Sequence, residues 1–579
     1  MCGIIGYIGE KEANDILISG LEKLEYRGYD SAGVAIAHES QIKINKVKGR
    51  VENLKSITII GNIGIAHTRW ATHGKPCQEN AHPFVDETNN FAIVHNGIIE
   101  NYLELKEELS REGVSFSSNT DSEIIVHLIA KNYHDNLKEA VLKTIKKLAG
   151  AYAFCVIKKD ASEIIGARNG SPLVVGIADS ENFLASDVSA LIEHTKKVVY
   201  LNDFQIAELK KDSCKVYNFD GVEENYEIKE INWTLEKAQK QGYKHFMLKE
   251  IFEQPDIIRE TMKVPIAIEK NFSRIIMVAC GTASYAGLIG KYLIEKLAKI
   301  PVTYEIASEF RYKEPLISKE DLVVAISQSG ETADTLAAIR LAKEKGAKTL
   351  GIINVIDSTI AREVDKVIYT RAGPEIGVAS TKAFLSQLMI IYKLAFNLSD
   401  QEELLEYIDD IILKIKSILS RSEEIKELAH NYYLSHNFLY IGRNLSFPLA
   451  LEGALKLKEI SYIHAEAYPA GELKHGPIAL VSEEMPTLAI CPKDAVYPKT
   501  FSNIEEIKAR EGKVISIATE GDEDIKKISD EVFYVPEVKE IFYPLICCIP
   551  LQLFAYHIAD FKECDIDKPR NLAKSVTVE

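Results

Sequence analysis

The chain has 579 residues, which is enough for about three domains of ordinary size. Lys and Arg number 69 against 85 Asp and Glu, so the formal net charge of −16 disfavours nucleic acid or an anionic membrane surface as the main partner. No uninterrupted apolar run approaches the ~18 residues of a membrane-spanning helix, and the N-terminus lacks the pattern of a signal peptide, so we expect a cytoplasmic protein.

The cysteines point to the same compartment. The nine cysteines form no Cys-x-x-Cys pair and no small-domain disulfide framework. We therefore expect free thiols in a reducing environment, with neither a metal site nor an organic cofactor.

The first candidate functional residue is Cys2. Removal of Met1 would make Cys2 the N-terminal residue, and its α-amine, with a pKa of roughly 7.7–8.0, would be a base next to the thiol. Such a residue combines nucleophile and base. The apolar alternation that follows in 3–8 predicts a strand. Position alone also allows an ordinary buried cysteine.

Polar residues lie after two further predicted strands and at the start of a predicted helix in the N-terminal half. Strands predicted at 63–66 and 91–94 precede Arg69 and the dipeptide Asn96-Gly97, and Asp121 stands at the start of a predicted helix. An Asn amide and a Gly N–H are suitable donors for an oxyanion. Arg69 and Asp121 could hold the carboxylate and the ammonium of a free amino acid. Alternatives remain open: Asn-Gly is a common turn, Arg69 could be a surface ion-pair residue, and Asp121 could be a helix N-terminal charge.

Together, residues 2–217 resemble the glutaminase domain of the N-terminal-nucleophile amidotransferases. The resemblance implies a four-layer αββα fold in which Cys2 forms a glutamyl thioester and Asn96 and Gly97 supply the oxyanion hole. It also implies that the glutamine is held by a set of further residues, of which Trp70 would gate the exit of ammonia. This set is Arg69, Trp70, Thr72, His82 and Asp121.

Residues 218–262 are charged and predicted to be mostly helical, and we interpret them as a connector. Beyond them the sequence is doubled. Predicted strands start near Ile275, Leu322, Thr349 and Val367, and again near Phe438, Thr487, Val514 and Val532. The intervals are 47, 27 and 18 residues in the first set and 49, 27 and 18 in the second. Strands separated by helical lengths predict two doubly wound α/β domains, although two unrelated folds of this type could give similar intervals.

Hydroxyl-bearing turns follow several of these strands. Ser327-Gln328-Ser329-Gly330-Glu331-Thr332 lies where a helix should begin, and the turns at 280–284 and 378–382 are similar. Backbone N–H groups and hydroxyls at a helix N-terminus can hold a phosphate without a lysine. Three such turns favour a monophosphate site over simple N-capping.

The second doubled unit carries a different cluster. Glu452, Lys456 and Glu459 lie at i, i+4 and i+7 and so share one helical face. His475 follows in a loop bounded by glycines, which favours a proton-transfer set. A solvated salt-bridge ladder and a structural histidine are the alternatives.

Both domains, at 263–398 and 428–569, resemble the sugar isomerase fold. With the glutaminase domain before them and the tail 570–579 after them, the chain resembles the isomerising glutamine–fructose-6-phosphate aminotransferase family from Cys2 to Glu579. The resemblance implies conversion of glutamine and fructose 6-phosphate to glutamate and glucosamine 6-phosphate, the first step of amino-sugar synthesis, by a homodimer. The sequence differs from the family pattern at Ala283, where family members often carry serine.

The same resemblance implies roles for residues of the doubled half. Glu459 would be the base that moves a proton between C1 and C2, His475 would assist ring opening from a neighbouring subunit, and Lys574 would form a Schiff base with the ketose. The other residues expected to contact the sugar phosphate are Thr282, Ser284, Ser327, Gln328, Ser329, Thr332, Val378, Ala379, Ser380, Glu452, Lys456 and Ala573.

Three other functions fit parts of the sequence. An amidotransferase that makes a phosphoribosylamine would need a pyrophosphate-binding loop, which we do not find. A non-catalytic sugar-phosphate sensor would have no use for Lys574 together with Glu459. Relatives that run the sugar chemistry backwards as deaminases would not need the glutaminase residues.

Overall fold

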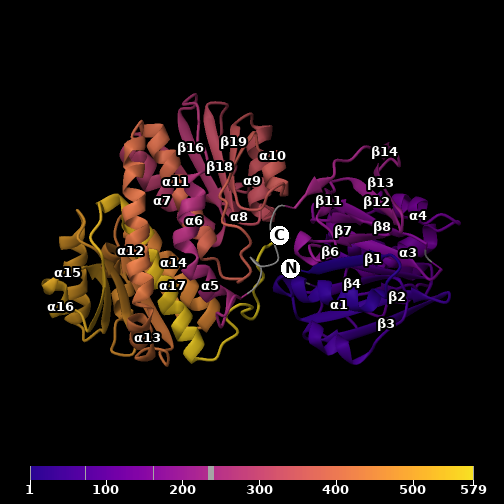
Figure 1. Cartoon of the computed structure of the whole chain (residues 1–579), viewed down its shortest axis with the longest axis horizontal. Helices are drawn as coiled ribbons and strands as arrows, with labels where there is room; N and C mark the ends of the chain where they lie inside the picture. Colours follow the sequence, from indigo (N-terminus) through magenta and orange to yellow (C-terminus); the bar gives the residue numbers. More distant parts are fainter. Residues whose placement is uncertain (1, 72, 161, 232–239, 578–579) are drawn as a thin grey trace. The chain divides into compact units, whose positions relative to one another are not determined.

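The chain forms two compact units, Met1–Lys237 with Ala573–Glu579, and Ala238–Leu572. The computed structural model describes residues 2–71, 73–160, 162–231 and 240–577. The N-terminal unit is indigo to purple in Figure 1, and the C-terminal unit runs from magenta to yellow.

The N-terminal unit contains two sheets in which all neighbouring strands are antiparallel. In order across the first sheet, the strands are β15 (Lys229–Glu230), β11 (Lys197–Tyr200), β9 (Val174–Ala178), β10 (Glu181–Ala185), β1 (Gly3–Ile8), β4 (Ile63–Arg69), β2 (Ser31–His38) and β3 (Gln41–Lys48). In the second they are β14 (Glu223–Glu224), β13 (Ser213–Asn218), β12 (Gln205–Lys210), β8 (Ile164–Asn169), β7 (Gly150–Lys158), β6 (Phe91–Ile99) and β5 (Phe84–Val85). The helices are α1 (Ala13–Leu24), α2 (Tyr102–Arg111), α3 (Glu123–Asn132) and α4 (Leu137–Ile145).

Strand alternation builds four layers from these elements. Ile5 and Tyr7 of β1 pack in the same core as helix α1, whereas Ile4 and Ile8 point the other way, into a core shared with the second sheet. Successive side chains of a strand face opposite sides, so each sheet has one face toward a helix layer and one toward the other sheet. A third core joins the second sheet to α2, α3 and α4. The predicted αββα fold is confirmed.

The strands of the N-terminal unit extend further than the sequence suggested. β4 continues to Arg69 and β6 to Ile99, so the polar clusters after residues 66 and 94 lie within strands. The unit also extends past residue 217, because β14 and β15 add to its two sheets. The connector at 218–262 is therefore wrong at its start.

It is also wrong at its end. Helices α5 (Phe246–Phe252) and α6 (Gln254–Met262) bury Met247, Ile251 and Ile258 in the main core of the C-terminal unit. They belong to that unit. The first part of the predicted helical stretch, residues 232–239, lies outside the described residues.

The C-terminal unit contains two five-stranded parallel sheets with the same strand order. The first runs β17 (Val302–Ile306), β16 (Arg274–Ala279), β18 (Asp321–Ser327), β19 (Lys348–Ile353) and β20 (Lys366–Tyr369). The second runs β22 (His464–Pro469), β21 (Asn437–Gly442), β23 (Thr487–Cys491), β24 (Val514–Thr519) and β25 (Glu531–Val535). In each sheet the second strand in the chain lies outside the first, so the order reverses between the first and third strands, at β16/β18 and β21/β23.

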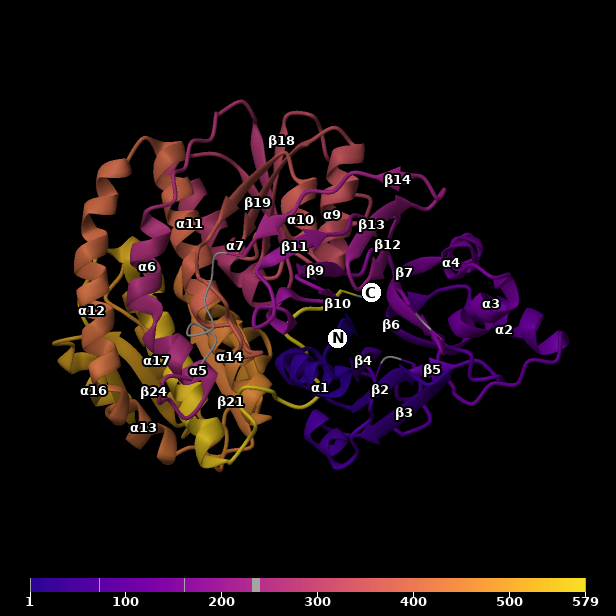
Figure 2. The same cartoon turned by 45° about the vertical axis from the view of Figure 1, so that its right-hand side comes forward.

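Helices cover both faces of each parallel sheet. Those that follow the first sheet's strands are α7 (Gly281–Leu297), α8 (Ala307–Phe310), α9 (Ala333–Glu344), α10 (Thr359–Glu363) and α11 (Lys382–Ser399). The remaining helices are α12 (Ile408–Ser420), α13 (Ser422–His430), α14 (Ser446–Ser461), α15 (Tyr497–Lys508), α16 (Glu523–Ile528) and α17 (Tyr543–Phe561). One core, to which both β16 and β21 contribute, continues from one sheet to the other. Helices α7 and α14, one from each domain, pack against each other (Figure 2). The two doubly wound domains therefore form one folded body.

Among the described residues, one helical segment, Glu540–Phe561, is long and apolar enough to cross a membrane. Its apolar window is entirely buried inside the structure, and α17 packs against α13 and α14. The segment is the central core helix of the C-terminal unit.

The C-terminal unit is tied together where α5 begins. The Asp567 carboxylate accepts hydrogen bonds from the backbone N–H of Phe246 at 2.9 Å and of Met247 at 3.0 Å. The first N–H groups of a helix have no partner within the helix, so this carboxylate acts as their cap. The Asp567 carbonyl also accepts from Val378 N–H at 3.0 Å, which holds the turn at 378–380.

We expect Asp567→Ala to destabilise this junction by about 1–2 kcal/mol, the usual cost of a lost helix cap. Hydrogen exchange at the amides of Phe246 and Met247 should become roughly 5- to 30-fold faster. Asp560→Ala is the matched control, since it removes an exposed ion pair with Lys244 in the same segment. Equal exchange rates in the two variants would contradict the cap.

Candidate functional site

Cys2 lies immediately before β1, at the end of the layer between the two sheets of the N-terminal unit. Gly3 pairs with Thr68 of β4, which places Cys2 beside the end of that strand. The Cys2 Sγ accepts a hydrogen bond from Trp70 N–H at 3.4 Å. Burial raises the pKa of the Cys2 thiol, and the nearby charges of Arg69 and Arg27 only partly oppose it. The thiol therefore needs a base to become a nucleophile.

Asn96 approaches Cys2 from the second sheet. Its Nδ2 donates to the Cys2 carbonyl oxygen at 3.1 Å, and Arg27 Nε donates to the same oxygen at 3.3 Å. The next residue, Gly97, has φ +127°, and a Cβ at this position would lie 2.0 Å from the Ala151 carbonyl oxygen. Only glycine fits there. The predicted partners Cys2, Asn96 and Gly97 are thus brought together at one end of the inter-sheet layer.

Arg69 and Asp121 are both buried near this end. Arg69 Nη2 donates to the carbonyl oxygens of His73 and Gly74, at 3.1 Å for Gly74. Its Nη1 is buried without a hydrogen-bond partner among the described residues. Burial lowers the Arg69 pKa, while Cys2, Asp30 and Asp121 are close enough to raise it. A buried guanidinium nitrogen with a spare donor suits a carboxylate ligand.

Asp121 is held in place by two donors. One carboxylate oxygen accepts from Ile99 N–H at 2.8 Å and the other from Ser122 Oγ at 3.4 Å. Ser122 precedes α3 and makes no side-chain cap bond to it. Asp121 is thus fixed by the end of β6, so it is more than a helix-terminal charge.

The remaining predicted glutamine-site residues have different surroundings. Trp70 is half-buried and holds the Cys2 thiol through its backbone. His82 is buried, and its Nδ1 accepts from His95 N–H at 3.2 Å while its ring stacks on His67 at 4.0 Å. The structure therefore places His82 in a layer that supports β6. Thr72 lies outside the described residues.

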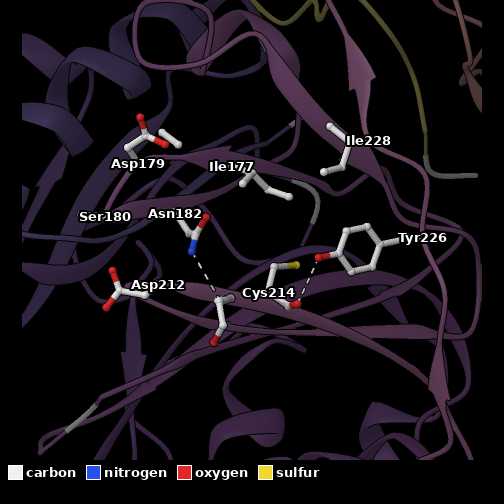
Figure 3. Close-up of a pocket in the computed structure, with 10 residues that line it drawn as sticks. Ile177, Asp179, Ser180, Asn182, Asp212, Cys214, Tyr226 and Ile228 are labelled. Carbon is white, nitrogen blue, oxygen red and sulfur yellow. Dashed lines mark hydrogen bonds between the residues drawn. The ribbon is translucent and has the colours of Figure 1, made fainter.

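A cavity of about 470 Å³ opens elsewhere on the same unit (Figure 3). It lies among the β9–β10 and β12–β13 turns, with Asp179, Asn182 and Asp212 in its wall. Asn182 pairs with Ile8, at the end of β1 opposite Cys2. None of the predicted site residues lines this cavity, and it is not the glutamine site.

In the C-terminal unit the hydroxyl-rich turn follows β18, beside the point where the strand order of the first sheet reverses. Ser327 is the last residue of β18, and its Oγ accepts from Gly330 N–H at 2.9 Å and lies 3.3 Å from Thr332 Oγ1. Thr332 is the N-cap residue of α9 but makes no side-chain cap bond. Ligands of such sheets bind beyond the strand C-termini at the reversal point, so Ser327, Gln328, Ser329 and Thr332 lie where a phosphate would bind.

The Glu331 carboxylate holds this turn against the start of α10. It accepts from Thr359 N–H at 2.8 Å and from Thr359 Oγ1 at 2.7 Å, and the Gly330 carbonyl accepts from Ile360 N–H at 2.9 Å. The turn is thereby joined to the start of α10. Sequence reasoning did not single out Glu331, although an acid within a hydroxyl-rich turn is the signal that could have found it.

The turn after β16 lies on the other side of the reversal point. Thr282 Oγ1 donates to Glu452 at 3.3 Å, which links the first domain to α14 of the second. Ser284 is buried, donates to the Gly281 carbonyl at 2.6 Å and accepts from Tyr304 at 3.2 Å. Both hydrogen-bonding roles of the Ser284 hydroxyl are thus used within the fold, and its contact with the sugar stays a prediction.

A buried carboxylate organises the turn that holds Val378, Ala379 and Ser380. Glu375 accepts from Ser380 Oγ at 3.1 Å and from the N–H groups of Thr381 and Ala383, each at 2.9 Å. Glu375 also lies close enough to Lys456 to raise its pKa. The turn and the helical cluster of α14 therefore face one site. Glu375 was missed because an acid in an irregular segment carries no periodic signal.

The helical cluster is an ionic triad and is not solvated. Lys456 Nζ lies 2.5 Å from Glu459 Oε2 and 3.6 Å from Glu452 Oε1. Glu452 and Lys456 are each 1 % exposed. Burial raises the pKa of Glu452 to about 8. Burial also opposes the charge of Lys456, but the carboxylates of Glu452 and Glu459 raise its pKa overall.

Three predicted site residues, His475, Ala573 and Lys574, come from elements other than α14. His475 ends a short 3₁₀ helix and is exposed. Ala573 and Lys574 belong to the segment that groups with the N-terminal unit. Their roles at the sugar site stay predictions.

Comparison with protein families gives a consistent result. A model described as a glutamine amidotransferase domain matches residues 67–193, and a SIS domain model matches 269–396 and again 432–559. The predicted doubling of the second half is confirmed.

Among solved structures, the C-terminal domain of glucosamine-fructose-6-phosphate aminotransferase from Francisella tularensis is 40 % identical with a TM-score of 0.55, and it covers 57 % of this chain and 100 % of that one. A putative tagatose-6-phosphate ketose/aldose isomerase from Clostridium novyi NT is 20 % identical with a TM-score of 0.51, covering 59 % of this chain and 96 % of that one. The second likeness concerns the fold alone.

Curated relatives match over their whole length. Glutamine–fructose-6-phosphate aminotransferase (isomerizing) from Aquifex aeolicus is 52 % identical over 592 aligned residues, covering 100 % of both chains. Proteins of the same name from Chlorobaculum tepidum and from Thermus thermophilus are 50 % and 47 % identical, also over 100 % of both chains. The chain therefore belongs to the family of isomerising glutamine–fructose-6-phosphate aminotransferases.

Proposed function

We propose that the protein is an enzyme that converts glutamine and fructose 6-phosphate to glutamate and glucosamine 6-phosphate. The observation that carries the proposal is the meeting of Cys2 and Asn96 at one end of the inter-sheet layer, beside the spare donor of Arg69. The same chain holds a phosphate turn at the strand-order reversal of a sugar isomerase domain. Glutamine hydrolysis thus supplies the ammonia that the sugar receives.

In the glutaminase unit, removal of Met1 gives Cys2 a free α-amine. The amine takes the thiol proton, and the sulfur attacks the side-chain amide carbon of glutamine. Asn96 Nδ2 and Gly97 N–H stabilise the oxyanion of the tetrahedral intermediate, which expels ammonia after protonation. Water then hydrolyses the thioester to glutamate. Arg69 and Asp121 hold the α-carboxylate and α-ammonium of the substrate.

In the sugar unit, Ser327, Gln328, Ser329 and Thr332 hold the phosphate, and the turn at 378–380 lies beside the sugar. Lys574 Nζ condenses with the C2 carbonyl of the open-chain ketose and releases the ketose oxygen as water. Ammonia then attacks C2 of this Schiff base and displaces the Lys574 amine, which leaves a sugar imine at C2. Glu459 then moves a proton between C1 and C2 to complete the isomerisation. Glu452 and Lys456 fix the position of Glu459.

We further propose that the enzyme works as a homodimer in the cytoplasm. His475, whose expected role is ring opening, is exposed in the single chain, as is nearby Leu480. A partner subunit that covers this surface would bring the histidine to a sugar site. All nine cysteines are free thiols, which suits a reducing compartment.

The first prediction concerns the nucleophile. Cys2→Ala should lower glutamine-dependent formation of both glutamate and amino sugar by at least about 10³-fold, because the attacking sulfur is gone, while fructose 6-phosphate binding persists. Both products are assayed in one incubation. Cys214→Ala, which removes a half-buried thiol at the distal cavity of the same unit, should keep wild-type turnover. Glutamine turnover in the Cys2 variant would refute the assignment.

The second prediction concerns the phosphate turn. Glu331→Gln keeps one acceptor but places an NH₂ group against a Thr359 donor, so we expect a rise in KM for fructose 6-phosphate of roughly 3- to 30-fold, the equivalent of about 1–2 kcal/mol. Glutaminase turnover should not change. Glu344→Gln, an exposed change at the far end of α9, the helix that follows the turn, is the control. An unchanged KM in Glu331→Gln would exclude this role.

Lys456 is the cation of the triad and faces its two carboxylates, with Glu375 close by. A proton on Glu452 therefore lowers the excess of negative charge at this buried site. The pKa of Glu452 in the folded chain is about 8, above its ordinary value of 4.5. Between these pH values the folded state keeps a proton that the unfolded state has released, so this group makes stability fall as pH rises.

The third prediction follows from this expected fall in stability with rising pH. Glu452→Gln removes the titration, so the melting temperature of the variant minus that of the wild type should increase from about pH 5 to about pH 8 and level off above it. Ligand-free protein is compared by calorimetry across this range. Glu472→Gln, an exposed change in the same unit, should show a constant difference. A constant or falling difference for Glu452→Gln would contradict the proton count.

A further inference from the structure

We infer that His67 is a positioning residue of the glutamine site, whose Nε2–H fixes the Asn96 side chain with its amide nitrogen toward Cys2. The inference rests on the proposed function and assigns a role to a residue that touches no substrate. His67 lies on β4, two residues before Arg69, and so faces the same inter-sheet layer.

The tautomer of His67 follows from its neighbours. His67 Nε2 lies 2.9 Å from the His95 carbonyl oxygen and 3.0 Å from Asn96 Oδ1. A backbone carbonyl can only accept, so Nε2 must carry the proton. Any group that shares this proton must also accept. The Asn96 side chain therefore presents its oxygen to His67, because its NH₂ group would meet a second donor there.

The contact made by the Asn96 amide nitrogen supports the same orientation of the side chain. Asn96 Nδ2 donates to the Cys2 carbonyl oxygen at 3.1 Å. An amide nitrogen carries two hydrogens, so a second N–H remains for the oxyanion that forms on the substrate. In the flipped orientation the amide oxygen would face both the Cys2 carbonyl and the oxyanion, and the electrostatic contribution would become repulsive. The proton on His67 Nε2 thus determines whether the Asn96 side chain stabilises or destabilises the oxyanion.

The surroundings of His67 keep its protonation state constant. His67 is fully buried, and its ring is stacked on His82 at 4.0 Å with an interplanar angle of 19°. Burial lowers its pKa to about 3, although the hydrogen bonds to Asn96 and His95 oppose the shift. Its Nδ1 has no hydrogen-bond partner within the described part of the chain. His67 therefore stays neutral and keeps its single proton on Nε2 at the pH of catalysis.

Two substitutions separate a positioning role from a packing role. His67→Leu removes the donor at similar volume, and His67→Gln keeps an amide N–H that can reach the place of Nε2. Loss of one oxyanion donor costs about 10²- to 10³-fold in kcat, and a disordered donor should cost roughly 10- to 100-fold. We expect His67→Leu to lower glutaminase kcat by that amount with KM for glutamine changed less than about 3-fold, and His67→Gln to restore most of kcat.

Two further measurements use the full-length protein. Alkylation of Cys2 by iodoacetamide, followed by peptide mass spectrometry, should proceed at the wild-type rate in His67→Leu, because this reaction forms no oxyanion. His127→Leu removes another buried histidine of the same unit, on α3, and should keep wild-type kcat.

The outcomes distinguish this inference from the proposed function. An active wild type with His67→Leu at full kcat would overturn the inference alone. So would failure of His67→Gln to recover turnover, or an equal loss in His127→Leu. A wild-type protein that releases no glutamate from glutamine would overturn the proposed function and this inference with it.

Discussion

The glutaminase half depends on the two-residue period of its strands. β1, β4 and β6 each place alternate side chains in the layer between the two sheets, and these side chains are apolar until the strands reach one end of the layer. At that end, the residues whose side chains face the layer are Cys2, His67 and Asn96. A one-residue slip would turn all three toward the helix layers. The apolar core that sets the strand register therefore also aligns the proposed catalytic residues Cys2 and Asn96 with the positioning residue His67.

The same constraint explains why the site is rigid where the chemistry needs it. Side chains on paired strands are held by backbone ladders on both sides, and the ring stack of His67 and His82 fills the space behind Asn96. In the proposed glutamine site, few hydrogen-bond donors then remain for the substrate. They include the second N–H of Asn96 and the Nη1 of Arg69, which has no hydrogen-bond partner in the described ranges. Electrostatic stabilisation is effective when donors are oriented before the charge develops.

The sugar half uses a different principle. Parallel strands place their C-terminal ends at one edge, and the reversal of strand order between β16 and β18 leaves room there for a ligand. Duplication supplies the second domain, whose helix α14 presents Glu452 to Thr282 of the first. In the proposed function, a phosphate turn from one domain and a charged cluster from the other thus serve one site.

Much of this arrangement could be predicted from the sequence, and the exceptions have physical causes. The eight predicted strand starts of the doubled half lie within one residue of the observed ones, because each of these strands carries adjacent apolar residues that pack in the cores of its sheet. β17 and β22 were missed because polar residues interrupt their apolar residues. Polar residues facing the site made β4 and β6 appear to end early. β14 and β15 have two residues each, which is too short for a periodic signal; β14 pairs with the preceding strand β13, and β15 with the distant strand β11.

The central claim is that Cys2, as the N-terminal residue, forms the covalent intermediate. The direct test is peptide mass spectrometry of active protein quenched during turnover with glutamine. The account predicts an N-terminal peptide that begins at Cys2 and carries a γ-glutamyl group on its sulfur. A fully active protein that retains Met1, or a glutamyl group on another cysteine, would contradict it.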